Sequence, residues 1–424
     1  MFKIVVSIVF IAFLVSGTIS QADDFQPRPL EPAEAELADL VKQMYAAYDK
    51  YYTQAEKIKD KQERDKYFAD HDPSTKYVSL LAEFERTHHG THAGLMAVRK
   101  LIHLGGGGGA FENPRDIGRR TILPVLPDYG QTREFPEIIR YLDGGNFDPE
   151  IEVTLRKLSK DPQISEENRL YARFMLARLS LKFRRMQQNW KSRLKELQEG
   201  QATSYPGEKE SLLHWQAMAR SEEKLVQLEQ EALQTLETLS TTSLKMRQPA
   251  LTNIDDDWHI IVFDPEQTKT KPTLKDMAAG LLFKERHLQE GQPGPDLKLK
   301  LVSGKDWSLA EQRGKAVIIQ FSFKGCGPCE AMYTDLRELK AKYEDKPSIL
   351  NIMADEDRKD TLDAFTSGKL PWNVYWDDYR GPIATRWSVT GFPTVYIIGP
   401  DGRIAAKQLR GQDLEAKIVE LVEE

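Results

Sequence analysis

The sequence predicts a mainly α-helical region followed by an α/β domain. Over residues 30–246, apolar side chains recur at spacings of three and four, as one buried face of a helix requires. After Gly291-Gln292-Pro293-Gly294-Pro295, short β-rich apolar runs alternate with helical stretches, which is typical of a sheet covered by helices. A length of 424 residues suits two or three such domains.

Composition and charge narrow the class of protein. The chain is 40% hydrophobic and 29% charged, as expected of a soluble globular protein rather than a disordered or membrane-spanning one. Its net charge of -6 is modest for this length, and we therefore expect no nucleic-acid partner.

The first residues have the form of a secretory signal. Lys3 precedes the apolar run Ile4 to Val15, and Ser20-Gln21-Ala22 supplies small residues for cleavage. We expect residues 1–22 to be a signal peptide and the mature protein to begin near Asp23. The apolar run is shorter than the ~20 residues of a membrane span, so a membrane tether is expected only if the signal stays uncleaved. The absence of N-glycosylation sequons and of a retention tetrapeptide favours a bacterial envelope, and hence the periplasm.

Residues 23–248 are assigned to the helical domain. Segments rich in Gly or Pro interrupt the helical pattern at Asp72-Pro73, Gly105 to Gly109, Asp143-Gly144-Gly145 and Asp161-Pro162. Their spacing suggests paired helices similar to tetratricopeptide-type repeats, although no fixed period with signature residues is present. The apolar positions on which the helices are predicted are Leu80, Leu81, Phe84, Leu95, Val98, Leu101 and Ile102, the block Arg169 to Leu197, and the stripe Leu225, Leu228, Ala232, Leu236 and Leu239.

Residues 249–290 form an irregular connecting region, with a strand candidate at His259 to Phe263 and a helix around Leu274 to His287. Residues 291–424 are assigned to the α/β domain. Its predicted strands are Ala316 to Phe321, Ile349 to Met353 and Thr394 to Ile398, with Arg403 to Gln408 as a hairpin partner after Gly399-Pro400-Asp401-Gly402; its predicted helices are Glu330 to Lys342, Asp360 to Ser367 and Leu414 to Val422.

The chemistry is predicted at Cys326-Gly327-Pro328-Cys329, which follows a buried strand and precedes a helix. A cysteine at a helix N-terminus has its pKa lowered by unpaired backbone N–H groups, which favours the reactive thiolate. Half of a zinc site is the alternative, but it would need further cysteines or histidines. These are the only two cysteines, His259 and His287 are the only histidines after residue 248, and residues 291–424 contain no histidine. We therefore expect redox chemistry, with neither a metal nor a cofactor.

Further motifs surround this pair. They are Asp306-Trp307-Ser308-Leu309, Arg313-Gly314-Lys315, Leu370-Pro371-Trp372, Gly391-Phe392-Pro393-Thr394 and Gly399-Pro400-Asp401-Gly402. With these motifs and CGPC, the sequence from about Pro295 to the end resembles the TlpA/ResA group of thioredoxin-like thiol:disulfide oxidoreductases of the bacterial envelope.

The resemblance implies a thioredoxin fold and exchange with protein thiols and disulfides. It also implies that an upstream electron donor of the envelope supplies the electrons. It implies that Pro393 is a cis-proline facing the disulfide, and that the Phe392 backbone binds an extended substrate segment. Cys326 is predicted as the nucleophile and Cys329 as the resolving thiol. Gly327-Pro328, the dipeptide of reducing thioredoxins, favours a reductant without fixing the direction of electron flow.

Four positions depart from the pattern of the family, and two of them, Ser322 and Gly325, replace the usual aromatic residues before the CGPC motif. Gln320 stands six residues before Cys326, where thioredoxin has a buried acid, and Met332 stands where some members carry a glutamate. Lys324 could help to hold the Cys326 thiolate, although a solvated surface lysine is the simpler interpretation.

Three alternatives remain open. The helical region could be a protein-binding scaffold with an accessory thioredoxin module, or the enzyme could be a thiol peroxidase, since peroxidases share the fold. His88, His89 and His92 could bind a metal, with His88 and His92 on one helix face, but ordinary surface or packed histidines are favoured.

Overall fold

The computed structural model describes residues 28–104, 118, 120–142, 149–201, 203, 208–243, 245–255, 260–343, 346–379 and 381–423. The predicted signal peptide (residues 1–22), the run Gly105 to Gly109 and Asp143-Gly144-Gly145 lie outside the described residues. Within the described ranges, no helix combines the length and the apolar character needed to cross a membrane.

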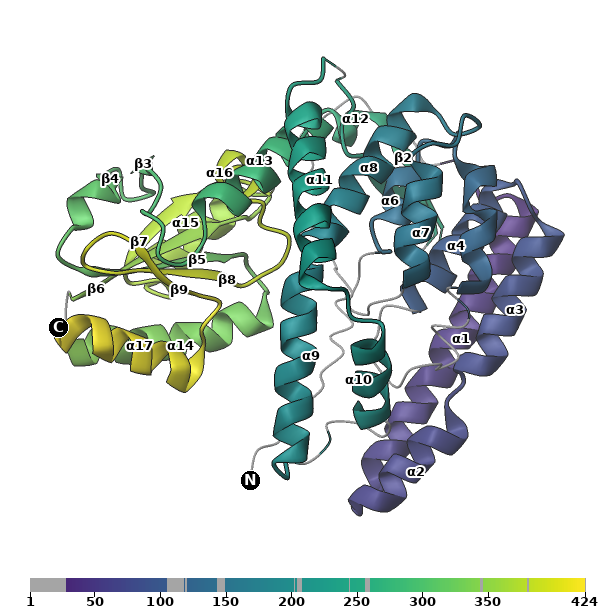
Figure 1. The fold of residues 1–424 in the computed structure, drawn as a ribbon, viewed down its shortest axis with the longest axis horizontal. Helices are drawn as coiled ribbons and strands as arrows, with labels where there is room; N and C mark the ends of the chain where they lie inside the picture. Colours follow the sequence, from purple (N-terminus) through teal and green to yellow (C-terminus); the bar gives the residue numbers. More distant parts are fainter. Residues whose placement is uncertain are drawn as a thin grey trace.

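The helical region forms the larger part of the molecule (Figure 1). Its elements are α1 (Pro32–Lys57), α2 (Lys61–His71), α3 (Ser74–Thr87), α4 (His92–Leu104), the 3-10 helix η1 (Leu123–Tyr129), α6 (Phe135–Ile139), α7 (Pro149–Leu158), α8 (Glu166–Ser180), α9 (Phe183–Gln198), α10 (Glu208–Ala217) and α11 (Glu222–Ser240). Side chains of Asp60, Ser165 and Ser221 accept backbone N–H groups at the starts of α2, α8 and α11. These caps satisfy donors that a helix N-terminus leaves unpaired.

Most of the predicted helical faces are confirmed by burial. All five positions of the stripe from Leu225 to Leu239 are buried in α11. Leu80 was expected in the core but is 40% exposed, so the prediction was wrong for this residue. The buried face of α3 runs through Tyr77, Leu81 and Phe84, and Leu80 lies about 100° away from Leu81 around the helix.

The histidine cluster also differs from the expected arrangement. α3 ends at Thr87 and α4 begins at His92, so His88 and His92 do not share a helix face. Instead, His89 Nδ1 lies 2.6 Å from Glu85 Oε1, and His92 Nδ1 lies 2.6 Å from Glu34 Oε1. The residues described here contain no group of three or more potential metal ligands.

The connecting region contains a small hairpin and the predicted helix. Strands β1 (Ala250–Asn253) and β2 (Ile261–Asp264) pair antiparallel, and the short helix α12 (Pro265–Thr268) follows. α13 (Leu274–His287) begins at the bounds expected from the sequence, where Thr273 and Asp276 form a capping box. This helix packs against α11 on one side and against α16 of the α/β domain on the other.

The α/β domain has the predicted alternation of strands and helices. Its elements are β3 (Lys298–Lys300), β4 (Asp306–Ser308), η2 (Ala310–Gln312), β5 (Ala316–Ser322), α14 (Gly327–Tyr343), β6 (Pro347–Met353), α15 (Arg358–Thr366), β7 (Asn373–Trp376), α16 (Pro382–Arg386), β8 (Thr394–Ile398), β9 (Ile404–Lys407) and α17 (Gly411–Glu423). The sheet order is β7-β6-β5-β8-β9, with β6 parallel to β5 and β7, and with β8 antiparallel to β5 and β9.

β5 lies at the centre of this sheet and is buried on both faces. Ile318 points into the core beneath α14 and α17, whereas Val317 and Phe321 point into the core beneath α16 and the β3–β4 hairpin. This alternation follows from the two-residue period of a strand. The position of Cys326, which follows β5 closely, is therefore fixed by a strand that is packed on both faces.

The junction of the two regions is built from close contacts. A Cβ added to Gly280 of α13 would collide with the Thr385 carbonyl oxygen of α16. The Arg386 guanidinium lies 4.5 Å from the centroid of the Phe283 ring. The Gly291 N–H then donates to the Ile404 carbonyl at 2.8 Å, so the chain runs beside β9 before β3 begins.

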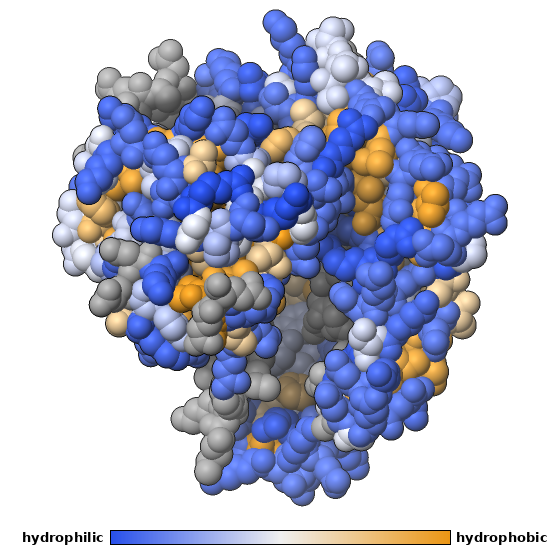
Figure 2. Space-filling model, turned by 60° about the vertical axis from the view of Figure 1, so that its left-hand side comes forward, coloured by the Kyte–Doolittle hydropathy of each residue, from blue (hydrophilic) through white to orange (hydrophobic). Residues whose placement is uncertain are grey.

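The surface in Figure 2 is mainly hydrophilic, with small hydrophobic patches separated by polar residues. The large apolar side chains that are exposed lie on separate elements, for example Val153 on α7, Leu213 on α10 and Val226 on α11. Single exposed apolar residues of this kind are normal and do not mark a docking face.

Candidate active site

Cys326 and Cys329 form a disulfide at the point where β5 gives way to α14. Their Cα atoms are 5.2 Å apart. Cys326 retains 5% of its surface in contact with solvent, and Cys329 retains none. The first cysteine is therefore the one that a partner can reach.

The first turn of α14 directs backbone donors at Cys326. The Cys329 N–H lies 3.3 Å from Cys326 Sγ, within hydrogen-bonding distance. Gly325 has a φ of +81°, a conformation that side-chain-bearing residues rarely adopt, and it turns the chain from the strand into the helix. The N-terminus of α14 therefore directs a backbone N–H donor at the Cys326 sulfur. Gly327 and Pro328 are the first two residues of this helix.

Gln320 lies beneath the disulfide and is fully buried. Its Nε2 donates to the Cys329 carbonyl at 3.4 Å, and its Oε1 accepts from Asn351 Nδ2 at 3.1 Å. Asn351 also accepts from Trp372 Nε1 at 2.9 Å. The hydrogen-bonded groups beneath Cys329 are thus neutral amides and an indole.

A hydroxyl pair extends this network. Ser322 Oγ lies 2.8 Å from the Tyr333 hydroxyl and accepts from Asn351 Nδ2 at 3.1 Å. Burial raises the pKa of Tyr333 to about 12, although its hydrogen bond to Ser322 works in the opposite direction. Tyr333 is therefore protonated at physiological pH and serves as a neutral hydrogen-bonding group.

The sequence indicated Gln320 but not Asn351 as part of the site. Gln320 and Asn351 are direct cross-strand partners of β5 and β6. An amide side chain inside each of two mainly apolar strands was the available signal, because buried amides need partners. Only the strand register shows that these two amides meet each other.

Charged side chains line the rim rather than the floor of the site. Lys324 Nζ is 2.6 Å from Asp360 Oδ1, and this hydrogen bond raises the pKa of the lysine. The Lys324 side chain is 62% exposed. The structure therefore directs the Lys324 ammonium to a carboxylate at the start of α15.

Two further carboxylates hold the loop that precedes Cys326. Burial raises the pKa of Asp355, which accepts the Lys324 N–H at 2.6 Å and the Thr361 hydroxyl at 2.6 Å. Glu330 accepts the Gly325 N–H at 3.3 Å and lies 2.7 Å from Lys369 Nζ, and the bond to Lys369 lowers the pKa of Glu330. Both carboxylates are engaged in fixing the loop.

Two aromatic rings meet beside the disulfide loop. Phe323 follows β5, and its ring is 5.2 Å from the ring of Phe392 in an edge-to-face arrangement. The peptide bond between Phe392 and Pro393 is cis, and β8 begins at the next residue. The structure thus brings Phe392 and Pro393 to the same end of the sheet as Cys326.

The sequence was compared with known families and proteins. A model of the AhpC/TSA family matches residues 291–407. The thioredoxin-like protein YneN of Bacillus subtilis is 32% identical over 124 residues, which cover 28% of this chain and 72% of that protein. Thiol-disulfide oxidoreductase ResA of Bacillus cereus is 27% identical over 142 residues, which cover 33% of this chain and 81% of that protein.

Among solved structures, the thioredoxin domain of a thiol-disulfide oxidoreductase from Bacteroides vulgatus is 26% identical, covering 32% of this chain and 98% of that one, with a TM-score of 0.30. Residues 291–407, which the family model matches, include the five-stranded sheet, the cysteine pair and the cis-proline. In its C-terminal third, this chain therefore belongs to the thioredoxin-like thiol-disulfide oxidoreductases.

Proposed function

We propose that this enzyme reduces protein disulfides outside the cytoplasm by exchange through Cys326 and Cys329. The observation that carries the proposal is the unequal setting of the two sulfurs. Cys326 is partly accessible to solvent and its sulfur accepts a hydrogen bond from the Cys329 N–H, whereas Cys329 is fully buried. An accessible, stabilised thiolate attacks, and a shielded thiol resolves.

The reaction begins with the reduced enzyme. The Cys326 thiolate attacks one sulfur of a substrate disulfide, the substrate S–S bond breaks, and one substrate cysteine leaves as a thiolate. Cys329 then loses its proton and attacks Cys326 Sγ, which releases the second substrate thiolate. Two electrons pass to the substrate, and the Cys326–Cys329 disulfide forms. An upstream dithiol donor of the envelope restores the reduced enzyme by the reverse exchange.

Gln320 supports this reaction as a positioning residue. Its bond to the Cys329 carbonyl fixes the first turn of α14 without adding a negative charge beside the sulfur. A buried carboxylate at this position would disfavour a nearby thiolate, because like charges repel strongly where water is excluded. Cys329 therefore has to release its proton without help from a carboxylate beneath it.

The substrate segment is expected to bind beside Phe392 and Pro393. A chain lying there in extended form can use the Phe392 backbone for hydrogen bonds, as an added strand does at a sheet edge. The edge-to-face rings of Phe323 and Phe392 offer an apolar surface for a side chain of the substrate. This placement would bring a substrate disulfide to Cys326.

Export and the reducing direction complete the proposal. The apolar run Ile4 to Val15 with small residues after it supports export to the periplasm. Gly327-Pro328 between the cysteines supports a reductant. Amino-terminal sequencing of the protein from the envelope fraction tests the first point, and the equilibrium potential against glutathione tests the second.

Insulin reduction with dithiothreitol tests the activity. The full-length enzyme should accelerate the reaction, and Cys326→Ser should abolish the acceleration. Cys329→Ser should accumulate a mixed disulfide through Cys326, and mass spectrometry of adducts from envelope extracts would identify the substrate. The absence of any adduct that depends on Cys326 would overturn the proposal.

A thiol peroxidase is the second candidate, because the matching family model carries the AhpC/TSA description. Peroxide consumption by the same preparations separates the two activities. Turnover of peroxide at a rate well above that of insulin reduction would favour the peroxidase.

A further inference from the structure

A cavity of about 510 Å³ opens at the edge of the sheet opposite to the disulfide. It lies where β5, β6 and β7 begin, whereas Cys326 follows the end of β5. Seven strand residues separate the two edges, a distance of roughly 20 Å. The cavity is therefore distinct from the site of disulfide exchange.

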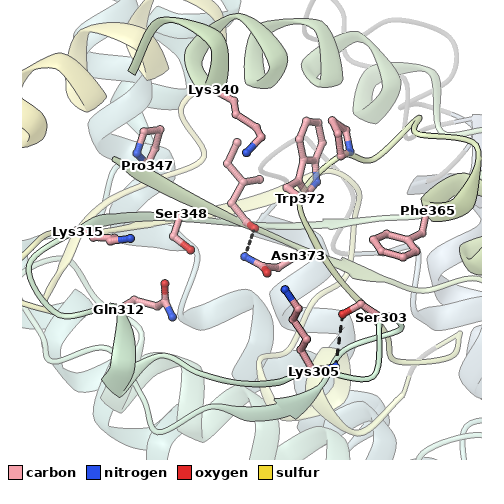
Figure 3. Close-up of a pocket in the computed structure, with 12 residues that line it drawn as sticks. Ser303, Lys305, Gln312, Lys315, Lys340, Pro347, Ser348, Phe365, Trp372 and Asn373 are labelled. Atoms are coloured by element: carbon pink, nitrogen blue, oxygen red, sulfur yellow. Dashed lines mark hydrogen bonds between the residues drawn. The ribbon is translucent and has the colours of Figure 1, made fainter. Parts of the chain in front are cut away.

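Among the described residues, the lining of the cavity contains three cationic side chains and no carboxylate. Lys305, Lys315 and Lys340 extend toward its middle from three sides (Figure 3). Within the described part of the chain, the ammonium groups of Lys305 and Lys315 have no ion-pair partner. Positive charge thus converges on a space that other side chains leave open.

Neutral groups complete the lining. Ser348 and Gln312 turn polar atoms toward the same space, and Trp372 and Phe365 form an apolar wall (Figure 3). The indole N–H of Trp372 is already bonded to Asn351, so its ring presents a surface rather than a donor. The arrangement combines an anion-binding end with a flat apolar side.

The backbone fixes the lysines on different elements. Val302 donates to the Val374 carbonyl at 2.9 Å, which holds the β3–β4 turn and Lys305 against β7. Gly314 donates to the Pro400 carbonyl at 2.9 Å, which places Lys315 just before β5. Lys340 lies in the last turn of α14. The site is therefore largely formed before a ligand arrives, which lowers the entropic cost of binding.

We propose that this cavity binds a small molecule that carries a phosphate or sulfate group, with a flat apolar part against Trp372. Three ammonium groups suit a tetrahedral anion that accepts several charge-assisted hydrogen bonds. The volume lies within the range of small-molecule sites and exceeds what a bare ion fills. The proposal does not depend on the redox function.

Phenyl phosphate and phenyl sulfate are the probes, titrated calorimetrically into the full-length oxidised protein. We expect saturable binding of one molecule per chain that weakens as sodium chloride is raised. Lys305→Ala and Lys315→Ala should each weaken the binding about tenfold, since each removes a charge-assisted bond. The tighter of the two probes identifies the class of anion.

Lys300→Ala is the matched control, because Lys300 is exposed on β3 of the same hairpin and does not line the cavity. Its binding should equal that of the wild type. The proposal is overturned if neither probe binds saturably, if Lys300→Ala weakens binding as much as Lys305→Ala, or if uncharged phenyl glucoside binds equally well. Insulin reduction by Lys305→Ala should be unchanged, so the outcome for this cavity is separate from that for the disulfide.

Discussion

At the scale of single residues, the two cysteines differ in exposure and in hydrogen bonding although only two residues separate them. We predict that iodoacetamide modifies Cys326 before Cys329 in the reduced protein, with a rate that rises around a pKa below the ~8.5 of free cysteine. Mass spectrometry of peptides labelled at several pH values measures both quantities. Cys329→Ser should label like the wild type, and faster labelling at Cys329 would reverse the assigned roles.

Gln320 is the buried residue at which we expect the introduction of a charge to have the largest effect. We predict that Gln320→Glu lowers the free energy of unfolding by about 2–5 kcal/mol at neutral pH, because a buried carboxylate lacks an ionic partner there. Burial would raise the pKa of the new carboxyl, so the loss should shrink as the pH falls and the group is protonated. Chemical denaturation at two pH values measures the change.

Gln412→Glu, at an exposed position of α17, is the control for that substitution and should change stability little. The Gln320→Glu enzyme should also show an added titration step in the pH profile of insulin reduction. Equal stability of the two variants at neutral pH would mean that Gln320 does not sit in a water-excluded network.

At the scale of elements, Glu34 joins α1 to α4. Its buried carboxylate accepts from Arg28 Nη1 at 2.6 Å and from the Glu31 N–H at 2.8 Å, and it lies 2.6 Å from His92 Nδ1. Burial alone would raise its pKa, but the bonds from Arg28, Glu31 and His92 outweigh burial and lower the pKa to about 2. The carboxylate is therefore ionised in the folded protein over most of the pH range.

A folded pKa of about 2 lies below the ordinary value of 4.5, so Glu34 stabilises the fold above pH 4.5. This contribution should be lost as the pH falls toward 2. We predict that Glu34→Gln costs about 1–3 kcal/mol at pH 7 and less at pH 3, measured by urea unfolding. Glu56→Gln, at an exposed site of α1, should cost little at either pH. A deficit for Glu34→Gln that does not depend on pH would contradict the ionic explanation.

At the scale of the whole molecule, we propose that the α/β domain folds as a separable unit with its boundary near residue 291. The contacts of the preceding segment refine the design of a fragment. Leu288 is fully buried in the core beneath α16, and its carbonyl accepts from Lys407 Nζ at 3.0 Å. Phe283 packs against the same core.

We predict that fragment 292–424 reduces insulin but is less stable than fragment 274–424. Loss of the buried Leu288 side chain alone should cost roughly 1–3 kcal/mol. Thermal unfolding of the two fragments measures the difference. The longer fragment carrying Leu288→Ala is the matched control and should reproduce most of the deficit. Failure of both fragments to fold would mean that α11 and the rest of the helical region supply packing that the α/β domain needs.

The sequence by itself determined the elements and the reactive pair. Apolar spacing, capping residues and turn residues act over a few positions, so these local patterns were enough to place α13 and the strands β5, β6, β8 and β9, whereas the short strands β3, β4 and β7 were not predicted. Cys326-Gly327-Pro328-Cys329 was recognisable because the reaction needs two thiols on one helical turn. The same local reasoning misplaced Leu80, whose exposure depends on how α3 rotates against its neighbours.

Only the tertiary structure decided which distant side chains meet. Gln320 contacts Asn351 through the register of two strands, and Glu34 contacts His92 across 58 positions of sequence. Lys305, Lys315 and Lys340 converge on one cavity from three elements. Such contacts are set by the packing of whole elements, in which many weak interactions act together, and no spacing within a single segment encodes them.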